Sequence, residues 1–153
     1  MFNLIQSITE STKLLIKGIE YSVIAKVIYV TENEPIKWYA KIQLENHYVL
    51  VISPFDDYMY FGYVGIPVQC DFPTPNFLIY NGKTFNKEAD DYQIVREFVF
   101  GDCLNMEGEV KFSDYSCDNE IISIGLITRT NERADVYAEQ LSIDDITVVN
   151  FEK

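Results

Sequence analysis

The chain has 153 residues, of which 12 are lysine or arginine and 24 are aspartate or glutamate, so its formal net charge is −12 at pH 7. A chain of this length, with 48% hydrophobic residues, is expected to form one domain whose core needs no disulfide or metal. Nucleic acids and anionic lipids are bound by clustered lysine and arginine, so this charge argues against both as partners. The acidity is concentrated in residues 42–153, which hold 20 acidic and seven basic side chains.

The sequence also predicts a cytoplasmic location. Residues 1–21 are interrupted by polar and charged side chains, so we expect no secretory signal, and the longest apolar run, Tyr48 to Ile52, is far shorter than the roughly 20 residues of a membrane span. The three cysteines, Cys70, Cys103 and Cys117, are odd in number and widely spaced. Such thiols are typical of a reducing compartment rather than of a disulfide framework.

In the first part of the chain, apolar side chains recur mostly with a period of two, which predicts β-strands. A short helix is expected first, from Asn3 to about Ser11. The following strand, Glu20 to Thr31, is apolar on both faces, which indicates a central position in a sheet. From Ile36 to Glu45, apolar and polar side chains alternate as in a half-buried strand, with Tyr39 and Lys41 on the polar face.

A tight reversal at Glu45 to His47 then leads into a strand at Tyr48 to Ile52 that we expect to be buried on both faces. A further strand is expected within Phe55 to Tyr63, which holds five aromatic residues and turns out of the sheet near Gly62 and Gly65.

In the second part, Asn81-Gly82 predicts a type I′ hairpin turn between strands at 77–80 and 83–85, because this dipeptide tolerates positive φ at both positions. Later strands are expected at 93–100, 108–115, 120–129 and 146–151, and 133–141 is either a short helix or extended. The fold class is therefore all-β or β-dominated α+β, with antiparallel twisted sheets forming a sandwich or a partly closed barrel. Two similar halves, about 14–64 and 77–150, are a further expectation.

Four short runs carry a resemblance to a known family. They are Gly18-Ile19-Glu20-Tyr21-Ser22-Val23, Lys37-Trp38-Tyr39-Ala40-Lys41-Ile42-Gln43-Leu44, Tyr80-Asn81-Gly82-Lys83-Thr84-Phe85, and Glu107-Gly108-Glu109 followed by Asp114-Tyr115. With these runs, residues 14–150 resemble an uncharacterised bacterial family of β-rich domains. The family's Trp-x-Glu-Tyr-x-Leu pattern is altered, since Ala40 stands at its acidic position. The resemblance implies a β-rich fold and no known activity.

Motifs for catalysis and cofactor binding are weak. His47 is the only histidine and lies in a predicted turn, so zinc binding or a Cys–His nucleophile pair is not expected. The sequence contains neither a Gly-x-Ser-x-Gly elbow nor a glycine-rich phosphate motif. We therefore expect no catalytic residue, no metal ion and no cofactor.

Carboxylates and tyrosines are the remaining candidates for a site. Glu107 and Glu109 would share one strand face and could serve glycoside hydrolysis, although paired acids such as Asp56-Asp57 are more often solvated turn residues. The chain has 11 tyrosines, and tyrosines on exposed strand positions would anchor a protein partner. The candidate binding residues are Tyr39, Asp56, Asp57, Tyr58, Tyr60, Glu107, Glu109 and Asp114.

Two functions remain open from the sequence. The first is a non-enzymatic, inhibitor- or immunity-like domain that binds another protein, possibly a basic one, through an acidic and tyrosine-bearing face. The second is a barrel that binds a small ligand or glycan in a carboxylate-lined pocket, with hydrolysis as an open question. A structural module with an exposed strand edge is a third alternative.

Overall fold

The computed structural model describes residues 1–101 and 109–150. Within this part of the chain, the elements are α1 (Phe2–Ser7), β1 (Thr12–Ile16), β2 (Ile19–Thr31), β3 (Glu34–Leu44), β4 (Tyr48–Ser53), β5 (Tyr58–Gly65), β6 (Phe77–Tyr80), β7 (Lys83–Gly101), β8 (Glu109–Cys117), β9 (Glu120–Ile127), β10 (Glu132–Arg133), β11 (Asp135–Leu141) and β12 (Ile146–Asn150). Two 3-10 turns, Glu45–His47 and Ile143–Asp145, precede β4 and β12.

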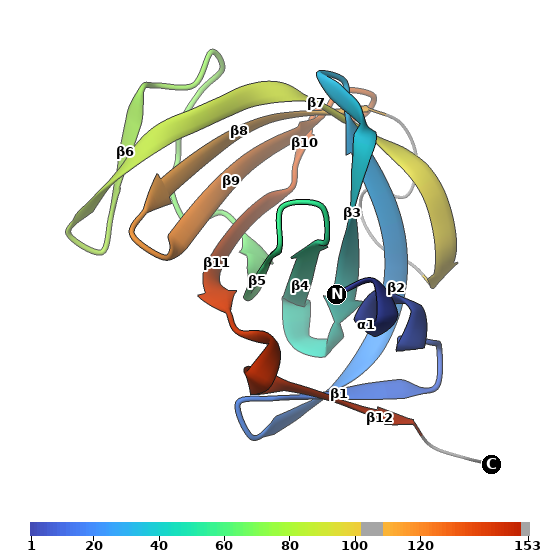
Figure 1. Ribbon diagram of the computed structural model, residues 1–153. Helices are drawn as coiled ribbons and strands as arrows, with labels where there is room; N and C mark the ends of the chain where they lie inside the picture. Colours follow the sequence, from blue (N-terminus) through green and yellow to red (C-terminus); the bar gives the residue numbers. More distant parts are fainter. Residues whose placement is uncertain (102–108, 151–153) are drawn as a thin grey trace.

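Eight antiparallel strands close into a barrel (Figure 1). The strand order runs β2-β3-β4-β5-β11-β9-β8-β7, and β7 pairs with β2 to complete the ring. This confirms the predicted β-dominated class in its barrel form. Residues 25–31 of the long β2 strand lie between β3 and β7, which agrees with the central position predicted from its two apolar faces, and residues 19–22 continue outward to pair with β1.

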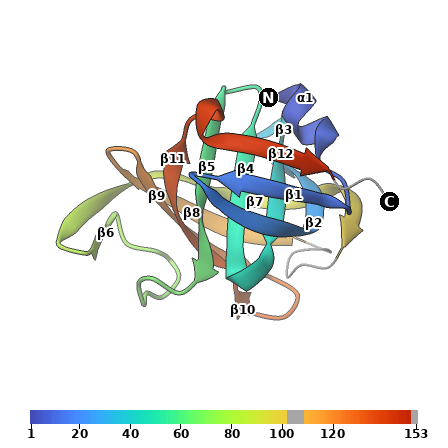
Figure 2. The same cartoon turned by 90° about the horizontal axis from the view of Figure 1, so that it is seen from below.

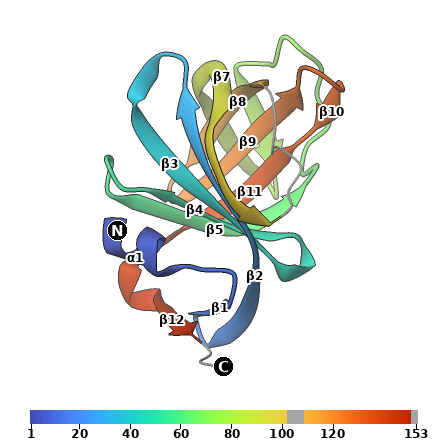
Figure 3. The same ribbon diagram turned by 90° about the vertical axis from the view of Figure 1, so that its right-hand side faces the viewer.

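A layer made of α1, β1 and β12 covers the outer face of β3, β4 and β5 (Figures 2 and 3). The main hydrophobic core fills the space between this layer and the barrel wall, and includes Leu14 of β1, Ile42 of β3 and Leu50 of β4, all fully buried. Lys26 of β2 holds the helix in place, because its ammonium donates hydrogen bonds of 2.8 Å to the carbonyl oxygens of Ile5 and Ile8. The largest core therefore lies outside the barrel.

A second outer layer covers β8 and β9. It consists of β6 and the irregular segment 66–76, which pack on Tyr115 and Ile122 of the wall. Arg133 attaches this segment to the barrel by donating to the carbonyl of Cys70 at 3.1 Å and to the fully buried Asp135 carboxylate. With both outer layers in place, apolar side chains are packed against the wall from outside.

Some expected elements differ from the structure. The expected gap between strands at 83–85 and 93–100 is absent, because β7 is one strand of 19 residues with a bulge between Lys87 and Ala89. The segment 133–141 is extended as β10 and β11, so the helical alternative is wrong. The first helix ends at Ser7, and β5 begins only at Tyr58, after a turn. The Asn81-Gly82 turn is confirmed, with φ of 51° and 73°.

Among the described residues, no helix is long and apolar enough to span a membrane. Cys70 and Cys117 are free thiols, whereas Cys103 lies outside the described residues.

Barrel closure depends on one glycine at the end of β7. Gly101 pairs with Ala25 of β2 and has a φ of 88°. A Cβ atom at this position would lie 1.9 Å from the carbonyl oxygen of Ile24, a backbone atom that cannot swing away. Gly82 offers a comparison, because its φ is also positive, at 73°, but a Cβ there meets nothing within 4 Å.

We predict that Gly101→Ala destabilises the protein much more than Gly82→Ala does. Each substitution places alanine at positive φ, which costs about 1–2 kcal/mol. Only Gly101→Ala adds a backbone clash, worth about a further 1–3 kcal/mol. Urea unfolding of the two variants measures both losses, and equal losses would show that closure at β2 and β7 is looser than described.

Candidate functional site

Strand alternation divides the side chains of the barrel wall into an outer and an inner set. On β3, Ala40, Ile42 and Leu44 point outward and are fully buried in the main core. Tyr39 and Lys41, which lie between them, therefore point into the barrel. The polar face of this strand, which the sequence suggests is exposed to water, lines the inside of the barrel instead.

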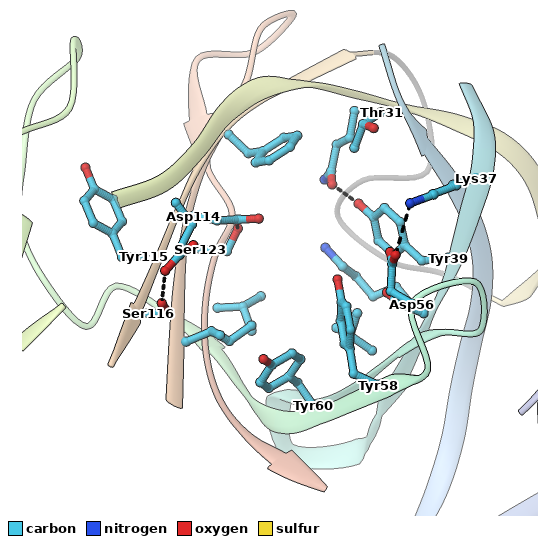
Figure 4. A pocket seen from close by; sticks show the side chains of 18 of the residues that line it. Thr31, Lys37, Tyr39, Asp56, Tyr58, Tyr60, Asp114, Tyr115, Ser116 and Ser123 are labelled. Atoms are coloured by element: carbon cyan, nitrogen blue, oxygen red, sulfur yellow. Dashed lines mark hydrogen bonds and ion pairs between the residues drawn. The ribbon is translucent and has the colours of Figure 1, made fainter. Parts of the chain in front are cut away.

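The same rule applies to β5 and β8. Met59 packs in the outer core, so Tyr58 and Tyr60 on either side of it point inward. Tyr115 packs in the outer layer over β8 and β9, so Asp114 beside it points inward. Figure 4 shows Tyr58, Tyr60 and Asp114 directed toward one space, while Tyr115 points away from it.

This space is a cavity of about 450 Å³, which we call the lumen cavity. Its volume falls within the range of about 300–1,000 Å³ that is usual for small-molecule sites. Part of its wall is apolar, because Val136 belongs to a buried inner cluster against which Val51 and Ile121 pack. Aromatic and polar side chains form the rest of the lining.

Asp114 is the central charged group of the lumen cavity. It is half-buried in the lining of the cavity and accepts a hydrogen bond of 2.6 Å from the Ser123 hydroxyl. Burial raises the pKa of this carboxyl to about 6. The hydrogen bond from Ser123 and the positive charge of Lys41 act in the opposite direction, and the charge of Asp90 adds to the rise.

Three tyrosines face the same cavity as this carboxylate. Burial raises the pKa of Tyr39, Tyr58 and Tyr60, and the negative charge of Asp114 raises all three further. A hydrogen bond from the Ser53 hydroxyl opposes the rise at Tyr58. All three phenols are therefore neutral at physiological pH and present hydroxyl groups that can both donate and accept hydrogen bonds.

A second inner group fixes Tyr39 and Lys41. The rings of Tyr29 and Tyr39 stack with centroids 5.6 Å apart, and the Tyr39 hydroxyl donates to the side-chain oxygen of Gln93. The ammonium of Lys41 lies 5.2 Å from the centroid of the Tyr29 ring, a cation–π contact. This group holds a positive charge against an aromatic face inside the barrel.

The mouth of the cavity is acidic. Its exposed carboxylates, which we call the acidic rim, are Glu34, Asp56, Glu88 and Asp118. Lys37 lies among them and pairs with Asp56 at 3.1 Å (Figure 4). It also pairs with Glu34 at 3.5 Å.

Five of the eight predicted site residues border this one cavity, namely Tyr39, Asp56, Tyr58, Tyr60 and Asp114. The expectation that the tyrosines lie on an outer face is wrong, because alternation along β3 and β5 turns them inward. Asp57 is exposed in the turn before β5, with a φ of 56°, and does not line the cavity. Glu109 lies five positions from Asp114 on the regular strand β8, hence on its opposite, outer face. Glu107 lies outside the described residues.

The sequence did not point to Tyr29, Lys41, Gln93 or Ser123 as site residues. Each lies on a predicted strand, an even number of positions from a side chain that points into the barrel. This even spacing was the signal that the sequence offered. It shows that side chains share one face of a strand, but not whether that face meets water or the inside of a barrel.

The described residues contain no group of three or more His, Cys, Asp or Glu side chains that could hold a metal ion. Comparison of the chain with family models, with curated proteins and with solved structures finds no match. The resemblance to a β-rich bacterial family therefore stays a prediction, and the site is interpreted from its geometry alone.

We predict that Asp114→Asn stabilises the fold at neutral pH. The carboxyl binds its proton more tightly in the folded state, with a pKa of about 6 against an ordinary value of 3.8, so stability falls as pH rises through this window. Asparagine removes that cost, a gain of about 1–3 kcal/mol at pH 7.5 that shrinks by about 1 kcal/mol at pH 5.

Denaturant unfolding at both pH values measures this difference. Asp71→Asn serves as the control, because Asp71 is an exposed aspartate that does not line the cavity. A gain for Asp114→Asn that is the same at pH 5 and pH 7.5 would contradict the burial of this carboxylate.

Proposed function

We propose that this protein binds a small polar molecule inside its barrel. The observation that carries the proposal is the lumen cavity itself, of about 450 Å³, with polar side chains directed into it. The interior of an eight-stranded barrel is wide enough either to be filled by its own side chains or to hold one small ligand. Here the main core lies outside the wall, and the interior is left open.

The lining resembles a binding pocket in its chemistry. Ligand pockets combine an apolar and aromatic wall with a few polar groups that fix orientation. In the lumen cavity, Val51 and Val136 contribute to the apolar wall, while Asp114, Ser123 and the tyrosine hydroxyls converge from other strands. Because these side chains are held on strands rather than on loops, the cavity is preformed.

Binding is better supported than hydrolysis. Glycoside hydrolysis needs two carboxyl groups about 5–9 Å apart on either side of one bond. Of the predicted pair, Glu109 points outward and Glu107 lies outside the described residues. The lining carboxylates other than Asp114 form the exposed acidic rim at the mouth, outside the part of the cavity that Asp114 faces.

The protein-binding hypothesis stays a prediction with a weaker basis. Its proposed anchors, Tyr39, Tyr58 and Tyr60, lie inside the barrel and present little surface to a protein. The acidic surface could still attract a basic partner, and ionic strength separates the two functions. Electrostatically steered association weakens strongly with salt, whereas binding in an enclosed cavity depends on it less.

We predict that a panel of small polar metabolites contains compounds that bind the wild-type protein saturably and that Val51→Phe abolishes this binding. The phenylalanine ring would occupy the cavity beside the apolar wall. Amide shifts in NMR spectra of the full chain report ligand entry, because the side chain of the single tryptophan, Trp38, packs against the outer core and not in the lumen. Ile79→Phe is the control, because Ile79 is 64% exposed on β6, away from the lumen.

Two results would refute the proposal. One is the absence of any binding compound in a panel that includes sugars, amines, amino acids and carboxylic acids. The other is binding that Val51→Phe leaves intact, since the ligand would then lie elsewhere on the protein.

A further inference from the structure

The lining of the lumen cavity carries more negative than positive charges. Among the described lining residues, five are carboxylates, namely Asp114 and the four residues of the acidic rim, and two are lysines, which leaves a net charge of −3. Neither arginine nor histidine occurs in this described lining. A site for an anionic ligand is usually built with arginine, whose planar group matches carboxylates and phosphates.

Both lysines already have partners for their charge. Lys37 forms ion pairs with two carboxylates of the rim, at 3.1 and 3.5 Å. Lys41 lies over the Tyr29 ring, and its charge also acts on Asp114. Even with this nearby lysine, the pKa of Asp114 stays raised to about 6 by burial, so the positive charge of the lumen compensates this carboxylate only in part.

The remaining lining suits a positive group as well. The face of an aromatic ring and the oxygen of a phenol are both electron-rich. Tyr58 and Tyr60 meet edge to face with centroids 5.1 Å apart and face the same cavity as Asp114, whose charge acts on both. The contact between Lys41 and Tyr29 shows that the barrel interior accommodates an ammonium group against a tyrosine. Tyrosines around one carboxylate form a suitable cage for a second ammonium.

We infer that the lumen cavity binds a small organic cation, an amine or a quaternary ammonium compound, with its charged nitrogen between Asp114 and the rings of Tyr58 and Tyr60. This inference rests on the proposed function and names the class of its ligand. The acidic rim and the net charge of −12 would raise the local concentration of such a cation at the mouth.

Neutral and anionic ligands fit the lining less well. A sugar would satisfy the hydroxyl groups but leave the Asp114 charge uncompensated inside the barrel, where burial disfavours it. An anion would have to pass the acidic rim and sit beside Asp114, which costs free energy by repulsion between like charges. A cation instead adds the missing positive charge.

The test compares cations with uncharged molecules of the same shape. Choline is paired with 3,3-dimethyl-1-butanol, in which carbon replaces the charged nitrogen, and putrescine is paired with 1,4-butanediol. Binding to the full chain is followed at pH 7.5 by amide shifts in NMR spectra. We expect at least one cation to bind about tenfold or more tightly than its neutral partner.

Two variants should change cation affinity in opposite directions. Asp114→Asn should weaken binding of the cation about tenfold, because it removes the negative charge, while Lys41→Met should strengthen it by removing a like charge. Neither variant should change the affinity of the neutral partner by more than about twofold. A purely structural effect on the cavity would move the cation and its neutral partner together.

The outcomes separate the two proposals. If the neutral compounds, or sugars and acids of the panel, bind as tightly as the cations and Val51→Phe abolishes their binding, the cation assignment is wrong and lumen binding stands. If no compound of either class binds, both proposals fail. If Tyr58→Leu and Tyr60→Leu both leave cation affinity unchanged in folded protein, the aromatic cage is wrong.

Discussion

The antiparallel pairing of β7 with β2 is the contact on which the rest of the structure depends, because it turns a sheet into a closed wall. A sheet has two equivalent faces, whereas a closed wall has an inside and an outside, and every strand must then divide its side chains between them. The helix, β1 and β12 supply an apolar partner for the outer face of β3, β4 and β5. The side chains that point into the barrel therefore do not need to form the main core and can be polar.

This inverted arrangement explains how a small domain can keep an unfilled interior. Stability comes mostly from apolar area buried outside the barrel, where residues such as Leu14, Ile42 and Leu50 are fully enclosed. Part of the interior is closed by the smaller cluster around Val136. A wall that is already packed from outside does not require its inner side chains to fill the lumen.

The sequence predicted strands, the hairpin at Asn81-Gly82 and the two faces of β3, because period and turn chemistry are local properties. It could not show that the face carrying Tyr39 and Lys41 meets a cavity, since polar alternation looks the same whether it faces water or a lumen. It also divided β7 into strands at 83–85 and 93–100, whereas pairing with β8 keeps residues 86–92, including Asp90-Asp91, extended. Asp114 appeared as one acid among many, and only closure of the barrel distinguishes it.

The position of Asp114 is costly for the fold. Burial raises the pKa of its carboxyl to about 6, which means that the ionised form is disfavoured where the protein must hold it at neutral pH. An asparagine could accept the same hydrogen bond from Ser123 without that cost, so the hydrogen bond alone does not account for an acid at this position. A cation bound beside Asp114 would compensate the negative charge and offset this cost. The charge that burial disfavours is therefore the group that favours a cationic ligand.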